Sequence, residues 1–174
     1  MSTEFPLQDI FLFSNLSSAE LEMVRNLLKY QTYLMGDKIV EEGTAGESLF
    51  VICSGRVCIT RRTDRESIVL TELGPNDFFG EMSLIDDFAT SATVQAVEDT
   101  TVFVMNRANF KALVSRGGPL SAKLWEALAR SLTMRIRKTD ELVKMYHGLN
   151  LALCENEEFR ALYTAWNFHS PKAG

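Results

Sequence analysis

Short runs of β-forming residues, separated at near-regular intervals by turn residues, fill the middle of this chain. The runs are rich in Val, Ile, Phe and Thr, and pairs such as Gly36-Asp37, Ser54-Gly55 and Gly74-Pro75 stand between them. A series of short strands with turns between them is typical of an all-β sandwich, barrel or roll. We expect strands at residues 31–34, 38–41, 48–53, 56–61, 67–73, 92–96 and 101–106.

Helical patterns flank this β region. Ser17, with Glu20 three residues later, forms a capping-box pattern ahead of apolar residues at helical spacing, which predicts a short N-terminal helix. A second short helix is expected over residues 106–114. Residues 120–147 contain no Gly or Pro and predict one long helix. The fold class is therefore mainly β with flanking helices.

The long helix carries two adjoining stripes. One stripe includes Trp125, Leu128, Leu132 and Leu142, and the other includes Leu124, Ile136 and Val143. Both stripes could pack on the strands of this chain, or one could pair with the same helix of a second subunit, which favours a homodimer through residues 120–147. We expect a domain over residues 1–147 and a helical tail over 148–174, whose aromatic face would dock on its own domain or recognise a partner; that face comprises Phe159, Leu162, Tyr163 and Trp166.

Composition narrows the function classes. Eighteen basic residues against 23 acidic ones give a net charge of −5, which disfavours direct binding to DNA. The N-terminus lacks a basic segment followed by an apolar run, and no apolar stretch is long enough for a membrane span, so we expect a cytoplasmic protein. His147 and His169 both lie in the C-terminal region, and Cys53 and Cys58 lack the spacing of zinc ligands. No metal site, catalytic residue or enzyme activity is expected.

The stretch from Phe78 to Ala96 contains the residues that could bind a ligand. Gly80 would let the backbone approach a ligand closely, and the amides of the turn that follows would face an anion. Glu81 could accept a hydrogen bond from a ribose hydroxyl, or it could be a carboxylate favoured at the start of a helix.

This stretch resembles the phosphate-binding cassette of cyclic-nucleotide-binding domains. Phe79-Gly80-Glu81-Met82-Ser83-Leu84-Ile85 matches its first half, and Ala92-Thr93-Val94 matches its end. The resemblance extends over residues 10–147 through roll positions such as Glu42-Gly43 and Phe50-Val51-Ile52. It implies a double-stranded β-helix (a jelly-roll-like β-roll), cAMP or cGMP as the ligand rather than a resident cofactor, and a regulatory role. It places ligand-binding residues at Phe79, Gly80, Glu81, Met82, Ser83, Thr90 and Ser91.

One position departs from the family pattern. Thr90 stands where the family places the arginine that pairs with the cyclic phosphate. Losing one partner of a buried charge pair costs about 3–5 kcal/mol, which is roughly a hundredfold to several-thousandfold in affinity. Hydroxyls of Thr90, Ser91 and Thr93 would be weaker donors. A distant cation could substitute, and the residues considered are Arg61, Arg62, Arg107 and Arg135.

The resemblance bears on the long helix as well. In catabolite-activator-like regulators this helix pairs across a dimer and contributes polar groups to the purine, a role that Arg135 and Thr139 could fill here. Alternatively, Arg135 extends to solvent and Thr139 specifies helix register. No helix-turn-helix domain is evident after residue 148. The chain is therefore expected to be a cyclic-nucleotide sensor with weak or altered binding, or a degenerate roll that dimerises and binds an unidentified protein without nucleotide.

Overall fold

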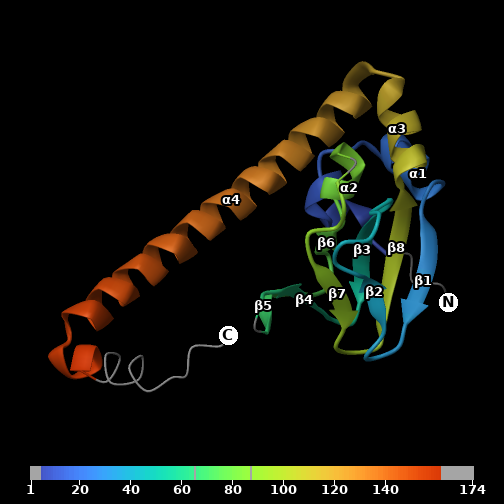
Figure 1. Ribbon diagram of the computed structural model, residues 1–174. Coiled ribbons are helices and arrows are strands. Elements are labelled where there is room, and N and C mark those ends of the chain that lie inside the picture. Colours follow the sequence, from blue (N-terminus) through green and yellow to red (C-terminus); the bar gives the residue numbers. More distant parts are fainter. Residues whose placement is uncertain (1–4, 65, 87, 162–174) are drawn as a thin grey trace. The chain divides into compact units, whose positions relative to one another are not determined.

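The computed structural model describes residues 5–64, 66–86 and 88–161 (Figure 1). The chain divides into two compact units, residues 1–129 and 130–174. In the first unit, the described residues form two antiparallel four-stranded sheets, ordered β1-β8-β3-β6 and β2-β7-β4-β5. These strands are β1 (Lys29–Tyr33), β2 (Lys38–Val40), β3 (Ser48–Ser54), β4 (Val57–Arg62), β5 (Ser67–Leu73), β6 (Phe78–Phe79), β7 (Thr93–Ala96) and β8 (Thr100–Asn106).

The helices lie at both ends of the sequence and inside the cassette region. They are the 3₁₀ turns η1 (Leu7–Asp9) and η2 (Phe11–Phe13), and the α-helices α1 (Ser18–Arg25), α2 (Met82–Ile85), α3 (Arg107–Ser115) and α4 (Gly118–Glu155). The predicted fold class, a β-roll flanked by helices with a long C-terminal helix, is confirmed.

The capping box predicted for the first helix is present. The Glu20 amide donates to Ser17 Oγ at 3.4 Å, and the Ser17 amide donates to Glu20 Oε2 at 2.7 Å. Glu20 also pairs with Lys123 Nζ at 2.7 Å, which links α1 to the start of α4. The Lys123 ammonium, which donates a hydrogen bond to the Glu20 carboxylate, lowers the pKa of that carboxyl to about 2.

Strand β3 separates two apolar cores. Because successive side chains of a strand point to opposite faces, Leu49 and Val51 face one core while Phe50 and Ile52 face the other. The second core lies between the two sheets and adds residues of β4, β6, β7 and β8. The first core joins the sheet to the helices, and it is completed by Leu7, Ile10, Leu12, Phe13, Leu16, Val24, Phe78, Leu84, Met105, Phe110, Leu113, Leu124, Ala127 and Leu128.

The seven predicted strands all form, with ends that differ by at most two residues from those expected. Strand β6 was not predicted, because two residues are too few to show a period. The long helix does not stop before Gly148 but continues to Glu155. A glycine inside a helix costs about 1 kcal/mol relative to alanine, which one continuous helix can tolerate.

The second unit contains the remainder of α4. Beyond Glu155, the Asn156 side chain accepts a hydrogen bond from the Phe159 amide at 2.9 Å, and residues 157–161 are helical. The other tail aromatics named above, Tyr163 and Trp166, lie outside the described residues, as does Leu162. In the part of the chain that the structure describes, no helix has the length and apolar character that crossing a bilayer requires.

Candidate functional site

The cassette (residues 78–96) begins at a backbone turn that requires glycine. Phe79 ends β6 and stacks on Phe50 of β3, with ring centroids 4.9 Å apart. Gly80 follows with φ of +81°, a conformation that side chains disfavour. A Cβ at Gly80 would also stand 2.3 Å from the Ser48 carbonyl oxygen. The main chain therefore turns tightly against β3, whereas the close approach to a ligand expected from the sequence stays a prediction.

Helix α2 places its four residues on two sides. Ser83 and Leu84 are buried, whereas Met82 and Ile85 are exposed. Glu81 occupies the N-cap position, makes no capping hydrogen bond with its side chain and is only 3% exposed. Glu81 is therefore both buried and at the start of a helix, and its role as an acceptor for a ribose hydroxyl stays a prediction.

Thr90 joins the end of the cassette to the loop before β3. Its hydroxyl donates to the Glu41 carbonyl at 2.5 Å and lies 3.2 Å from the Thr44 carbonyl. Its amide donates to the Thr44 carbonyl, and the Gly43 amide donates to the Thr90 carbonyl, both at 2.9 Å. An antiparallel bridge between residues 45 and 89 continues this ladder. The hydroxyl, amide and carbonyl of Thr90 thus all bond to the main chain of the neighbouring loop.

Gly46 lies where the two parts of the cassette meet. A Cβ at Gly46 would stand 2.0 Å from Ser83 Oγ and 2.9 Å from Thr90 Cγ2. The Arg107 guanidinium donates a hydrogen bond to the Gly46 carbonyl from the start of α3. Of the cations considered as substitutes, Arg107 is therefore held beside the loop that borders the cassette.

The remaining predicted site residues lie in different surroundings. Ser91 is exposed, and the Thr93 hydroxyl accepts a hydrogen bond from the Glu42 amide at 3.1 Å. Arg135 and Thr139 belong to the second unit, where the Thr139 hydroxyl donates to the Arg135 carbonyl at 2.9 Å. Their participation in ligand binding stays a prediction. Of the predicted cassette residues, Ser83 and Thr90 lie close together, both beside the position that a Cβ of Gly46 would occupy.

Sequence reasoning missed the loop over residues 41–46 as part of this site. Its contribution comes from main-chain carbonyls and from the missing side chain of Gly46, so no polar side chain marks it. The spacing of Gly43 and Gly46, two glycines three residues apart before a buried strand, was the available signal.

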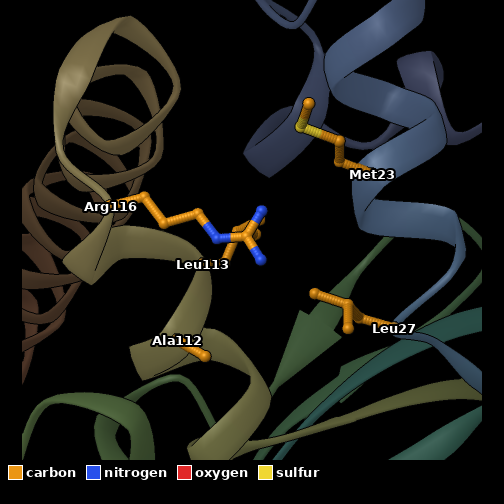
Figure 2. A pocket seen from close by; sticks show the side chains of 5 residues that line it. All are labelled: Met23, Leu27, Ala112, Leu113 and Arg116. Carbon is orange, nitrogen blue, oxygen red and sulfur yellow. The ribbon is translucent and has the colours of Figure 1, made fainter.

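A recess of about 210 Å³ lies between α1 and α3, away from the cassette (Figure 2). Figure 2 shows the Arg116 side chain reaching across it from α3 toward α1. Its walls are otherwise apolar, and it lacks the set of convergent polar groups that a nucleotide requires. Met23, Leu27, Ala112, Leu113 and Arg116 line it, and none of them belongs to the cassette.

The cysteines differ in exposure. Burial raises the pKa of the Cys53 thiol to about 11, and burial together with Glu72 raises that of Cys58. Cys154 on α4 is exposed. Among the residues whose placement the structure gives, no three His, Cys, Asp or Glu side chains cluster as a metal site would.

Comparison with known families identifies the class of protein. Residues 30–116 match the family described as cyclic nucleotide-binding domain. That span runs from β1 to the end of α3 and includes the whole cassette. The chain belongs to the cyclic nucleotide-binding domain family.

Two similar proteins come from the bacterium Thermus thermophilus. The cyclic AMP receptor protein of Thermus thermophilus is 35% identical over 130 residues, which cover 74% of this chain and 58% of that protein. The crystal structure of the Thermus thermophilus catabolite activator protein has a TM-score of 0.71 at 30% identity, covering 79% of this chain and 63% of that one. This chain therefore spans less than two thirds of either relative.

A third structure is informative at the cassette. It is the regulatory subunit of a cAMP-independent protein kinase A from Trypanosoma brucei, with a TM-score of 0.64 and 25% identity over 72% of this chain and 44% of that one. A variant of that subunit, in which a glutamate, a threonine and a valine are replaced by alanine, arginine and alanine, is described as bound to cAMP in its A site.

Proposed function

We propose that this chain is a non-enzymatic regulatory module whose cassette binds a cyclic nucleotide, cAMP or cGMP, weakly or with altered selectivity. The ligand would contact Phe79, Gly80, Glu81, Met82 and Ser83 at the start of the cassette and Thr90 and Ser91 at its end. The observation that carries this proposal is the glycine-dependent turn at Gly80, followed by a buried Glu81, in a chain of this family.

Thr90 sets the expected affinity. In the Trypanosoma brucei subunit the replaced threonine follows the replaced glutamate by seven positions and directly precedes the valine. Ser83, Thr90 and Ser91 have the same spacing here. A cAMP-bound variant with arginine at that threonine, in a subunit described as cAMP-independent, supports the inference that Thr90 weakens phosphate binding.

A second function is favoured by the contacts of Thr90. Its hydroxyl already donates to the loop over residues 41–46, so it is satisfied without an anion. In this alternative the roll is a degenerate scaffold for dimerisation and for an unidentified protein partner. Both functions include a homodimer through residues 120–147, with Arg135 and Thr139 near the ligand in the first, and neither includes direct DNA binding or a membrane anchor.

Calorimetric titration of the full chain with cAMP and cGMP, combined with thermal shift, separates the two functions. The sensor predicts dissociation constants near the millimolar range, because loss of a buried charge partner costs about 3–5 kcal/mol. Absence of both heat and thermal shift at millimolar nucleotide would remove the sensor function and leave the scaffold.

The companion variant is Thr90→Arg, with Ser91→Arg as the matched control. Returning the cation to position 90 should tighten cAMP binding by about a hundredfold or more. Arginine one position later, at an exposed residue, should give far less. Equal gains from both variants would mean that a non-specific positive charge, and not the cassette geometry, attracts the phosphate.

A further inference from the structure

The outer surface of the cassette carries exposed apolar side chains, and the ligand contact proposed for Met82 uses its main-chain amide rather than this side chain. Met82 is 48% exposed and Ile85 45%, and these residues lie three apart on the outward side of α2. Phe88, three residues further on, is 76% exposed. Single exposed apolar residues are common, but three within seven positions form a concentrated patch. We refer to Met82, Ile85 and Phe88 as the cassette patch.

An acidic residue is built into this patch. Asp86 Oδ1 accepts a hydrogen bond from the Phe88 amide at 3.2 Å. No ion pair involves Asp86 within the described part of the chain. Asp87 follows it in the sequence. A surface that combines apolar side chains with a carboxylate is complementary to a segment that combines apolar side chains with cations.

Helix α4 offers a face with that chemistry. Residues 130–145 contain five basic and two acidic residues, in a chain whose overall charge is −5. Met134, Arg137, Lys138 and Met145 share one side of the helix at spacings of three, four and eleven residues. Met134 and Met145 are both at least half exposed. Methionine side chains adapt to irregular apolar surfaces, so they suit such a contact. We refer to these four residues as the basic face.

The basic face is separate from the stripe that contains Leu142, which is one of the two stripes that could pair with a second helix. Arg135, Thr139 and Leu142 lie on that stripe, about 100° around the helix from Met134. A homodimer held by the stripe alone would leave the basic face uncovered.

We propose that the cassette patch of one chain binds the basic face of α4 from a second copy of this chain, with Asp86 opposite Arg137 and Lys138. In a two-fold symmetric dimer this contact occurs twice, because the patch of each copy meets the basic face of the other. It goes beyond the proposed function because it assigns the surface of the cassette, rather than its interior, to subunit association.

Self-association of the full chain, measured by sedimentation velocity without nucleotide, tests the proposal. The variant Met82→Ser/Phe88→Ser should weaken association by about tenfold or more, as expected for removal of central apolar contacts. Met35→Ser is the matched control, because Met35 is 71% exposed and lies in the turn between β1 and β2. Circular dichroism verifies that each variant is folded.

Exchanging charges between the cassette patch and the basic face tests whether the patch binds α4 of a second copy. Asp86→Lys and Arg137→Glu/Lys138→Glu should each weaken self-association, and an equimolar mixture of the two should recover part of it as a heterodimer. Unchanged association in the patch variants, or no recovery in the mixture, overturns the proposal and assigns association to the helix stripe. A chain that stays monomeric at every concentration overturns it too. Because no nucleotide is present, each result is independent of whether the cassette binds cAMP.

Discussion

The opening half of the cassette (residues 79–83) and its closing half (residues 89–91) differ in the interactions that hold them. The opening half is set by backbone geometry and burial: a positive φ at Gly80, a stacked Phe79 and a buried Glu81. The closing half carries Thr90, whose hydroxyl bonds to two carbonyls of another loop.

This difference shows that the shape of the cassette and its charge can change separately. The opening half depends on backbone geometry and burial, which the whole roll enforces. In the closing half, the Thr90 hydroxyl bonds to main-chain carbonyls of the loop over residues 41–46, so this polar group is satisfied within the roll. Mutations in each half should therefore have different kinds of effect.

The largest effect on stability is expected in the opening half, from Gly80→Ala. The new Cβ would meet the Ser48 carbonyl at 2.3 Å in a backbone conformation that alanine disfavours. Strain and overpacking together should cost about 2–4 kcal/mol of unfolding free energy. Urea denaturation measures this cost, with Gly74→Ala as the control, since nothing lies within 4 Å of its Cβ position. Equal effects at Gly74 and Gly80 would contradict a specific requirement in the opening half.

A smaller effect is expected in the closing half, from Thr90→Val. Valine keeps the methyl group beside Gly46 but removes the hydroxyl that bonds to the Glu41 carbonyl. The unfolding free energy should fall by about 1–2 kcal/mol, the cost of losing a partly buried hydrogen bond. The exposed Ser91 gives the control, because Ser91→Ala should change stability by less than about 0.5 kcal/mol. If Thr90→Val is neutral, the hydroxyl does not hold the loop and the comparison between the halves fails.

The smallest effect concerns a site outside both halves, the Glu20–Lys123 ion pair. The folded pKa of Glu20, about 2, lies below its ordinary value of 4.5, so the pair stabilises the fold above pH 4.5. That contribution is lost as the pH falls from 4.5 toward 2. Stability curves against pH should show this loss in the wild type and not in Glu20→Gln. The same loss should persist in Thr90→Val, because separate sites add independently.

The sequence was sufficient for most of the roll and for half of the site. The short continuous apolar run of β3 and the capping box at Ser17 are local signals, and both led to correct elements. Gly80 could be predicted because its role depends on its own conformation. The partners of Thr90 could not, since Glu41 and Thr44 lie more than 40 residues away and contribute backbone carbonyls, which every residue has.

The end of α4 illustrates another limit of sequence reasoning. Gly148 has a poor helix propensity, and it suggested that the helix would end near His147. In the structure the helix continues through it to Glu155. Propensity at one position weighs little against good helix-forming residues on both sides.

The unequal exposure of the three thiols has a practical consequence for studying this chain. Cys53 and Cys58 are held as protonated thiols near neutral pH because their pKa values are raised, whereas Cys154 is open to solvent on α4. A maleimide dye should attach to Cys154 first, in the native protein and without engineered cysteines. Fluorescence from that single label would follow the environment of α4 while nucleotide or a second copy is added.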